Sequence, residues 1–104
     1  MAITLKLLPA MSVVGVDKTQ KFTATITDAP VDSTTVFEWK VNKVVQQSTI
    51  NTMDYKAVDV GTYSITVKST TSAEGAEDIV LVESTTLTAE ANTMTARAVV
   101  TVAN

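Results

Sequence analysis

Residues 36–41 constrain the fold of this chain more than any other stretch, because they carry its only tryptophan and alternate with a period of two. Phe37, Trp39 and Val41 fall on one side of an extended chain and the residues between them on the other, a pattern typical of a strand with one face in a core. A tryptophan buries roughly 150–250 Å² of surface. Since a chain of 104 residues is long enough for one core, we expect residues 1–104 to form a single domain around Trp39.

The composition favours an all-β fold. Threonine fills 19 positions and valine 16, and such an excess of β-branched residues is typical of strands. The hydrophobic fraction of 45% excludes a disordered chain, and the net charge of −3 argues against a nucleic-acid partner. No apolar run is long enough to span a membrane. Cysteine is absent, so we expect the sheets to pack without a disulfide.

Alternation along the chain predicts a series of short strands, with the apolar members of each on one face. The predicted strands cover residues 2–8, 11–14, 19–27, 36–41, 44–48, 52–56, 62–70 and 95–102. Pro9 ends the first strand because it cannot donate to a ladder, and residues 11–14 are expected to resume in the opposite sheet. Asn42 and Lys43 form a predicted two-residue hairpin turn, since asparagine tolerates the positive φ that this turn needs. Lys6 with the apolar residues 7–16 could also be a short signal peptide, but Pro9 and Gly15 interrupt the run, so a first strand is favoured.

Residues 72–91 are the least regular part of the sequence. A polar, acidic loop at 72–78 is followed by an apolar run at 79–82 and a strand-like stretch at 84–88. An ordinary β-sandwich needs one strand after residues 62–70, and residues 95–102 supply it. We therefore interpret residues 79–91 as an extra strand or part of a long hairpin. A helix over residues 73–83 is the alternative, which Gly75 and the β-branched residues at 79 and 80 disfavour.

The sequence offers little for catalysis. Histidine and cysteine are missing, which removes the usual general base, the thiol nucleophile and the common zinc ligands. We therefore expect no catalytic residues, no cofactor and no metal site. Glu74, Glu77 and Asp78 could chelate Ca²⁺, but their spacing matches no calcium-binding loop.

Two other groups of residues have both a functional and a structural interpretation. Trp39 and Tyr63 could line a sugar or peptide site, but at inward strand positions they are more often part of a core. Lys40, Lys43 and Lys56 could form a small basic patch, although they are ordinary surface charges for an acidic protein.

The run from Asp59 to Tyr63, D-x-G-x-Y, precedes a predicted strand and resembles the tyrosine corner of immunoglobulin-like domains. The resemblance implies that the Tyr63 hydroxyl binds the backbone just upstream, and we expect Asp59 to accept backbone hydrogen bonds. It also implies an antiparallel immunoglobulin-like β-sandwich of seven to nine strands without a disulfide.

Residues 19–25, 37–42 and 60–67 together resemble the repeated immunoglobulin-like domains of tailed-phage virions, most closely those of the highly immunogenic outer capsid (Hoc) protein of T4-like phages. Residues 95–102 also resemble the T-x-T-V pattern in the last strand of those domains. The resemblance implies a non-enzymatic capsid decoration protein, made in the host cytoplasm and located on the virion surface. Its implied partners are the major capsid protein or another virion protein, with a host cell surface as a further partner.

The chain departs from this family in two ways. Hoc is a string of domains that ends in a separate capsid-binding domain, whereas this chain has one predicted domain, and residues 72–91 are longer than the corresponding family connection. A bacterial cell-surface or phage tail or fibre module, serving adhesion or spacing, is therefore an alternative. An accessory carbohydrate-binding module is a third, but it would need exposed aromatic side chains.

A decoration domain acts through loops and edge strands held by a rigid scaffold. Residues 72–91 mix acidic groups with an apolar run, as an interface with an apolar centre and a charged rim would. The candidate partner-binding residues are Glu74, Glu77, Asp78, Ile79 and Leu81. An extra hairpin that packs on its own domain is an equally open interpretation of this segment.

Overall fold

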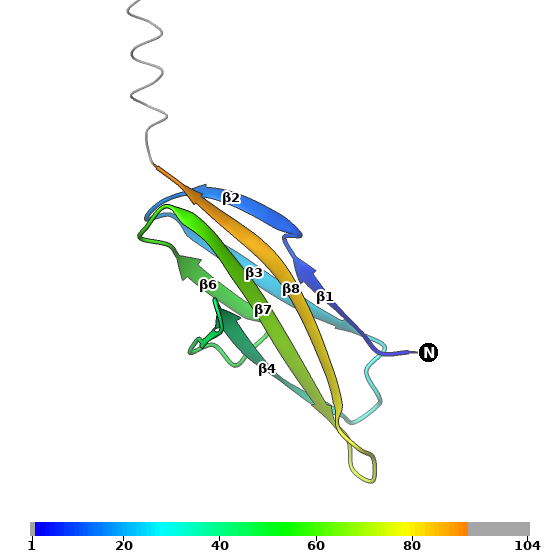
Figure 1. The fold of residues 1–104 in the computed structure, drawn as a ribbon. Coiled ribbons are helices and arrows are strands. Elements are labelled where there is room, and N and C mark those ends of the chain that lie inside the picture. The colour runs from blue at the N-terminus through cyan, green and yellow to red at the C-terminus, as the bar shows by residue number, and fades with distance from the viewer. Residues whose placement is uncertain (1, 92–104) are drawn as a thin grey trace, which may run out of the picture.

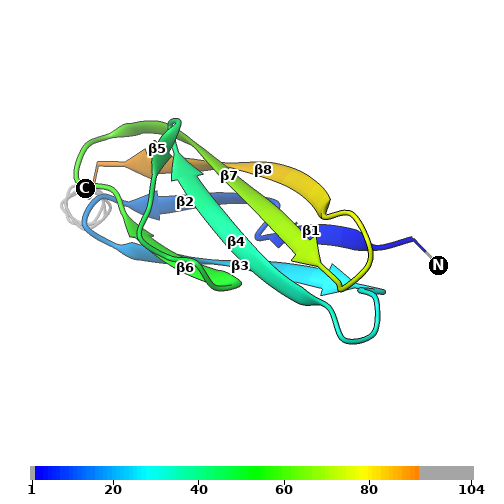
Figure 2. The same cartoon turned by 90° about the horizontal axis from the view of Figure 1, so that it is seen from below.

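The computed structural model describes residues 2–91, and all regular secondary structure in this range is β-strand. The strands are β1 (Thr4–Leu8), β2 (Met11–Gly15), β3 (Thr19–Thr27), β4 (Thr34–Val41), β5 (Val44–Val45), β6 (Thr52–Lys56), β7 (Gly61–Ser72) and β8 (Ile79–Glu90). They form two sheets, ordered β1-β3-β6 and β2-β8-β7-β4-β5. Figure 2, seen from below, shows β3 and β6 on one side of the molecule and β7 and β8 on the other. The predicted all-β, two-sheet architecture is confirmed.

The core lies between the two sheets and is built from the faces that the alternation predicts. Trp39 of β4 has no exposed surface, and neither have Phe22 of β3 and Ile65 of β7. Each of these residues is followed two positions later by another buried one, because successive side chains of a strand point to opposite faces. The other buried members of the cluster are Leu7, Ala24, Val41, Met53, Val67 and Leu87.

The beginning of the chain is divided between the two sheets. β1 pairs with β3, the chain bends at Pro9 and Ala10, and β2 then joins β8 in the other sheet. The Thr85 hydroxyl fixes this bend by donating to the carbonyls of Pro9 and Ala10. The predicted change of sheet is confirmed. Because the chain does not reverse at Pro9, β2 runs parallel to β8, whereas the other strand pairs of the described residues are antiparallel as predicted.

The turn between β4 and β5 is as predicted, but the strand after it is shorter. Asn42 and Lys43 have φ angles of 50° and 72°, which a primed hairpin turn requires. Strand β5 ends at Val45 instead of the predicted residue 48, because the chain then crosses to the other sheet. Among the hydrogen bonds that hold this crossing, the Trp39 Nε1–H donates to the Ile50 carbonyl at 2.8 Å, and the Ala24 N–H donates to the Asn51 carbonyl at 2.8 Å.

Of the two interpretations of residues 79–91, the structure shows the long hairpin, whereas the alternative helix over residues 73–83 is wrong. Residues Ile79–Glu90 form one continuous strand, β8, which pairs antiparallel with β7 from Thr71↔Ile79 to Gly61↔Ala89. Its Leu87 and Ala89 are 0% and 1% exposed, because the inward face of its second half packs into the core. The predicted last strand, residues 95–102, lies outside the described residues.

The turn from β6 into β7 contains the predicted tyrosine hydrogen bond. The Tyr63 hydroxyl donates to the backbone carbonyl of Asp59 at 2.7 Å. The acceptor on Asp59 is its backbone carbonyl, so this bond does not involve the Asp59 carboxylate, for which the sequence predicts hydrogen bonds from backbone N–H groups.

Candidate interaction surface

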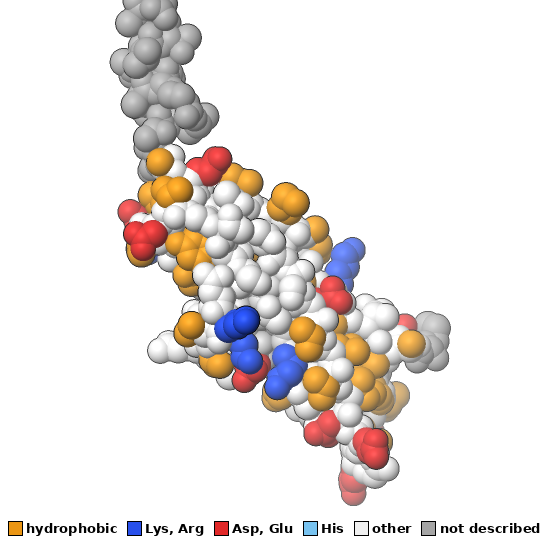
Figure 3. All heavy atoms as spheres, in the orientation of Figure 1, with side chains coloured by type: hydrophobic (Ala, Val, Ile, Leu, Met, Phe, Trp, Pro, Cys, Tyr) orange, Lys and Arg blue, Asp and Glu red, His pale blue; other side chains and the backbone are white. Residues whose placement is uncertain are grey.

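The far end of the β7–β8 hairpin carries the acidic residues that the sequence singles out. Gly75 has a φ of 80°, in the left-handed region that favours glycine, and the Ala76 N–H donates to the Ala73 carbonyl at 3.1 Å. This tight turn leaves Glu74, Glu77 and Asp78 exposed. Figure 3 shows red side chains gathered at this end of the molecule.

The apolar run that follows is divided between the two faces of β8. Ile79 and Leu81 point inward, opposite Thr71 and Ser69 of β7, and are half-buried. Val80 and Val82 point outward and are each 54% exposed. The five predicted partner-binding residues therefore lie together at one end of the fold, the three acids on the loop and Ile79 and Leu81 on the adjoining strand.

The structure adds a feature that sequence reasoning missed, which is an open strand edge. β2 pairs with β8 only from Met11↔Thr86 to Gly15↔Glu90, so within the described residues the stretch 79–85 has a strand neighbour on the β7 side alone. Figure 1 shows β2 beside the upper part of β8 only. An open edge presents unpaired backbone N–H and C=O groups to other chains. The sequence carries no signal of it, because the edge is left open by where β2 ends on β8, a contact between residues far apart in the chain.

Glu83 is the one carboxylate on the inward side of this open stretch. Its register partner is the fully buried Val67, yet Glu83 itself is exposed, because it lies where β2 no longer covers the edge. Among the described residues it takes part in no ion pair. An inward-facing charge next to an open edge opposes unselective pairing with other strands.

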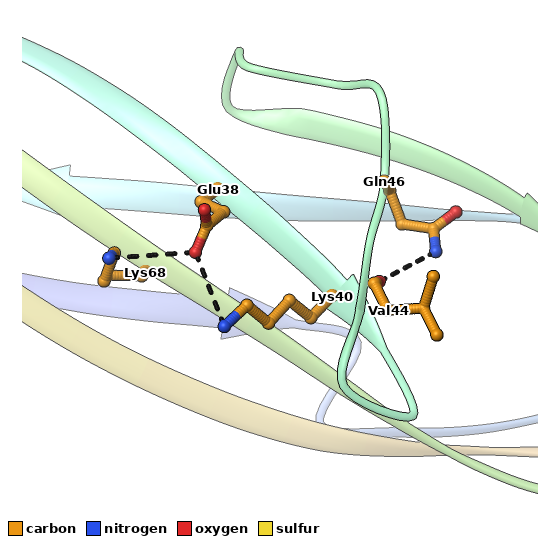
Figure 4. Close-up of polar contacts among 5 residues, drawn as sticks. All are labelled: Glu38, Lys40, Val44, Gln46 and Lys68. Carbon is orange, nitrogen blue, oxygen red and sulfur yellow. Dashed lines mark hydrogen bonds and ion pairs between the residues drawn. The ribbon is translucent and has the colours of Figure 1, made fainter.

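The outer face of the larger sheet combines lysines with valines. The Glu38 carboxylate lies 3.7 Å from the Nζ atoms of both Lys40 and Lys68, as Figure 4 shows. These pairs are exposed and therefore contribute little stability. The three lysines do not form the basic patch considered above, because Lys56 lies on β6 in the other sheet and Lys40 is paired with a carboxylate, which agrees with their interpretation as ordinary surface charges.

The aromatic residues belong to the fold rather than to a binding face. Trp39 is fully buried, and Tyr63 is half-buried against Tyr55 with ring centroids 5.7 Å apart at 56°. Burial raises the pKa of Tyr55, and the neighbouring Tyr63 and Asp59 act in the same direction.

A concave area lies beside the crossing from β5 to β6. It is an open hollow of about 520 Å³ with one carboxylate in its lining, that of Asp54. Amide and apolar side chains make up most of the remainder, so the hollow offers no acid–base pair for catalysis. Nowhere in residues 2–91 do three acidic side chains converge as a metal site would require, and no helix there is long and apolar enough to cross a membrane.

Comparison of the sequence with models of known protein families yields no match, and neither does comparison with curated proteins.

Proposed function

We propose that this chain is an immunoglobulin-like domain of a phage virion, a non-enzymatic capsid decoration protein that binds the major capsid protein or another virion protein. The observation that carries the proposal is the strand arrangement. The order β1-β3-β6 against β2-β8-β7-β4-β5, with the first strand divided between the sheets, corresponds to strands A-B-E and A′-G-F-C-C′ of an immunoglobulin-like domain. The bond from Tyr63 to the Asp59 carbonyl supports the same assignment.

In this proposal β8 takes the place of the last strand, G. The hairpin between strands F and G is then the β7–β8 hairpin, which is long and ends in the acidic turn. Loops at the ends of such a domain are usual binding elements, because the sheets hold them rigidly. The absence of histidine and cysteine from the sequence supports a binding role rather than an enzymatic one.

The virion contact is assigned to the hairpin end, where Glu74, Glu77 and Asp78 are exposed next to the partly exposed Ile79 and Leu81. An acidic rim of this kind suits a partner surface that carries lysine or arginine. Charge complementarity at an interface rim mainly raises the association rate, so the contact should weaken as salt rises.

The test is cosedimentation of the purified chain with capsids assembled without it. Replacing Glu74, Glu77 and Asp78 with serine should lower capsid binding about tenfold at low salt while leaving the melting temperature unchanged. The matched control replaces Asp54, Asp59 and Glu90 with serine, which removes the same charge from exposed positions elsewhere. If both variants lose capsid binding equally, the loss is due to the change in net charge, and the hairpin is not the binding site. No binding by the wild-type chain would favour an adhesion or spacer module of a cell surface or phage fibre.

A further inference from the structure

The outer face of the larger sheet has an exposed apolar centre. Val36 of β4 and Val80 of β8 are both register partners of Thr70 of β7, so the three residues form one row across the sheet. Val36 and Val80 are each 54% exposed, and so is Val82, two positions further along β8. Apolar side chains that adjoin one another on an exposed sheet face mark a contact site for another protein.

One end of this face is acidic. The loops 28–33 and 73–78 lie side by side there, because the strand residues that adjoin them, Thr34 and Ser72, are register partners. Neither loop contains a lysine or an arginine. Together the loops expose five carboxylates, those of Asp28, Asp32, Glu74, Glu77 and Asp78.

The same face carries lysines on the other side of the valine row. Lys40 and Lys68 lie there, and Lys43 follows at the exposed turn after β4. The Glu38 carboxylate balances one of these three positive charges. Figure 3 shows blue side chains beside orange ones over the middle of the molecule and red ones gathered at its lower end. The face therefore has a negative end, an apolar centre and a positive side.

We propose that a second copy of this chain packs against the outer face of the larger sheet, about a two-fold axis that crosses the strands at the row of Val36 and Val80. Such an axis makes both copies use the same face, so that the acidic end of each lies over the lysines of the other. The proposal concerns contacts between copies and does not rest on the proposed virion function. Each acidic turn can serve only one of the two contacts at a time.

Residues at equal distances from the axis face each other in this arrangement. Val36 and Val80 then face their counterparts in the second copy. Lys40 and Asp32 lie four residues from Val36 in opposite directions along the chain, which is about 13 Å of extended chain at roughly 3.3 Å per residue. Lys40 of each copy therefore lies above the acidic loop that carries Asp32 in the other. Matched charges across an interface steer association and fix the orientation of the partners.

The opposite orientation is disfavoured. A second copy that packed on this face with its strands in the same direction would place the two acidic ends against each other. Like charges brought together in this way penalise the wrong arrangement. The charges of the face therefore select the two-fold arrangement.

The face is large enough for a stable contact. β7 and β8 have twelve residues each, or about 40 Å at roughly 3.3 Å per residue, and four neighbouring strands at about 4.8 Å are about 19 Å wide. Each copy therefore offers roughly 750 Å², close to the ~800 Å² per partner of a standard interface.

The outer face of the smaller sheet lacks this arrangement. It also carries three lysines, Lys6, Lys21 and Lys56. Its one exposed large hydrophobic side chain within the described residues is that of Leu8, on the edge strand β1. These lysines therefore surround no apolar centre, which leaves the larger sheet as the self-complementary face.

The experiment is sedimentation of the full chain over a concentration series, with its mass compared with the 11.0 kDa of one copy. The wild type should form dimers reversibly as its concentration rises. Val80→Lys should weaken dimerisation roughly tenfold or more, because it places two like charges at the axis. The matched control, Val58→Lys, adds the same charge at an exposed valine between β6 and β7 and should leave dimerisation intact.

A mixing experiment tests the arrangement of charges. One variant carries Lys40→Glu and Lys43→Glu, and the other has Glu74, Glu77 and Asp78 replaced with lysine. Each should dimerise roughly tenfold more weakly than the wild type, because like charges then meet at both ends of the contact. An equimolar mixture should recover most of the wild-type affinity, since both ends of the mixed dimer again join opposite charges. A variant that merely failed to fold would not be rescued by mixing.

Crosslinking reports the position of the axis. The chain has no cysteine, so a short bismaleimide reagent can link Val80→Cys chains only through the introduced thiols, which meet at the axis. Thr86→Cys lies on the same outward face of β8. It is six residues further along, which places it about 20 Å from the axis, so it should not be linked.

Three results would overturn the proposal. The first is a wild type that stays monomeric to about millimolar concentration. The second is dimerisation that Val80→Lys leaves intact, and the third is a mixture that dimerises no more tightly than its two variants alone. None of these measurements involves a capsid, so the virion function can fail without affecting them.

Discussion

The role of Trp39 can be measured with a substitution that keeps a ring at the centre of the core. Trp39 is 0% exposed, and its indole N–H donates to the Ile50 carbonyl at 2.8 Å. Trp39→Phe removes that donor and the second ring but leaves an aromatic side chain in place. It therefore tests both the packing of β4 and the attachment of residues 46–51.

The expected loss is the sum of two contributions. The missing hydrogen bond accounts for about 0.5–1.5 kcal/mol, and the Ile50 carbonyl can then bind water because Ile50 lies at the surface. The missing part of the indole accounts for about 1–1.5 kcal/mol, since each buried methylene-sized group contributes about 0.8 kcal/mol. Trp39→Phe should thus lower the free energy of unfolding by about 1.5–3 kcal/mol, and Trp39→Ala, which leaves a larger cavity, by about 3–5 kcal/mol.

Urea unfolding followed by far-UV circular dichroism measures this loss, because the variants lack the fluorescent indole. With a slope of about 1.5 kcal/mol per molar urea, Trp39→Phe should lower the midpoint by about 1–2 M. Trp39→Ala should leave a domain whose total stability is typically about 5–15 kcal/mol barely folded. Val36→Ala, on the outward face of the same strand, is the control and should cost less than about 1 kcal/mol. If the midpoints of both Trp39 variants stay near that of Val36→Ala, Trp39 does not organise the core.

Three further predictions concern single polar groups. Tyr63→Phe deletes the hydroxyl that binds the Asp59 carbonyl and should cost about 0.5–1.5 kcal/mol in a urea titration, with an unchanged value arguing against a structural role for this bond. Ser69→Ala should raise the melting temperature, because the Ser69 hydroxyl is buried without a hydrogen-bond partner among the described residues. A buried hydroxyl without a partner costs about 1–3 kcal/mol. A lower melting temperature would mean that the hydroxyl does form a hydrogen bond in the folded protein. Burial raises the pKa of Tyr55 above 10.0, so the folded state holds that proton more tightly than the unfolded chain does. Stability should therefore be complete below about pH 10 and fall as the pH rises through the folded pKa, and Tyr55→Phe should flatten that fall in alkaline melting curves.

The sequence alone determines which residues of the longer, alternating strands β3, β4 and β7 face the core. The period-two pattern identifies Phe22, Trp39 and Ile65 as inward, because neighbouring side chains of a strand point to opposite sides whatever the strand pairs with. The turn at Asn42 and the bond from Tyr63 to Asp59 are also readable, since both depend on residues within a few positions of each other.

The same pattern could not identify which segment lies next to β7. Residues 79–90 and 95–102 both have the composition of a strand, and in the sequence Glu83 divides the first of them into an apolar run and a short strand-like stretch. In the structure β8 continues through Glu83, because that residue lies at an open edge where its carboxylate reaches water. Whether an edge is open depends on where β2 ends, and that is a contact between residues far apart in the chain.

The candidate surface also has one part that the sequence identifies and one part that only the structure identifies. Glu74, Glu77 and Asp78 could be read from the sequence as an exposed acidic turn, since clustered charges beside a glycine are rarely buried. The open edge beside them depends only on the tertiary structure. A strand's own residues determine which way its side chains point, whereas its neighbours determine which of its backbone groups remain unpaired.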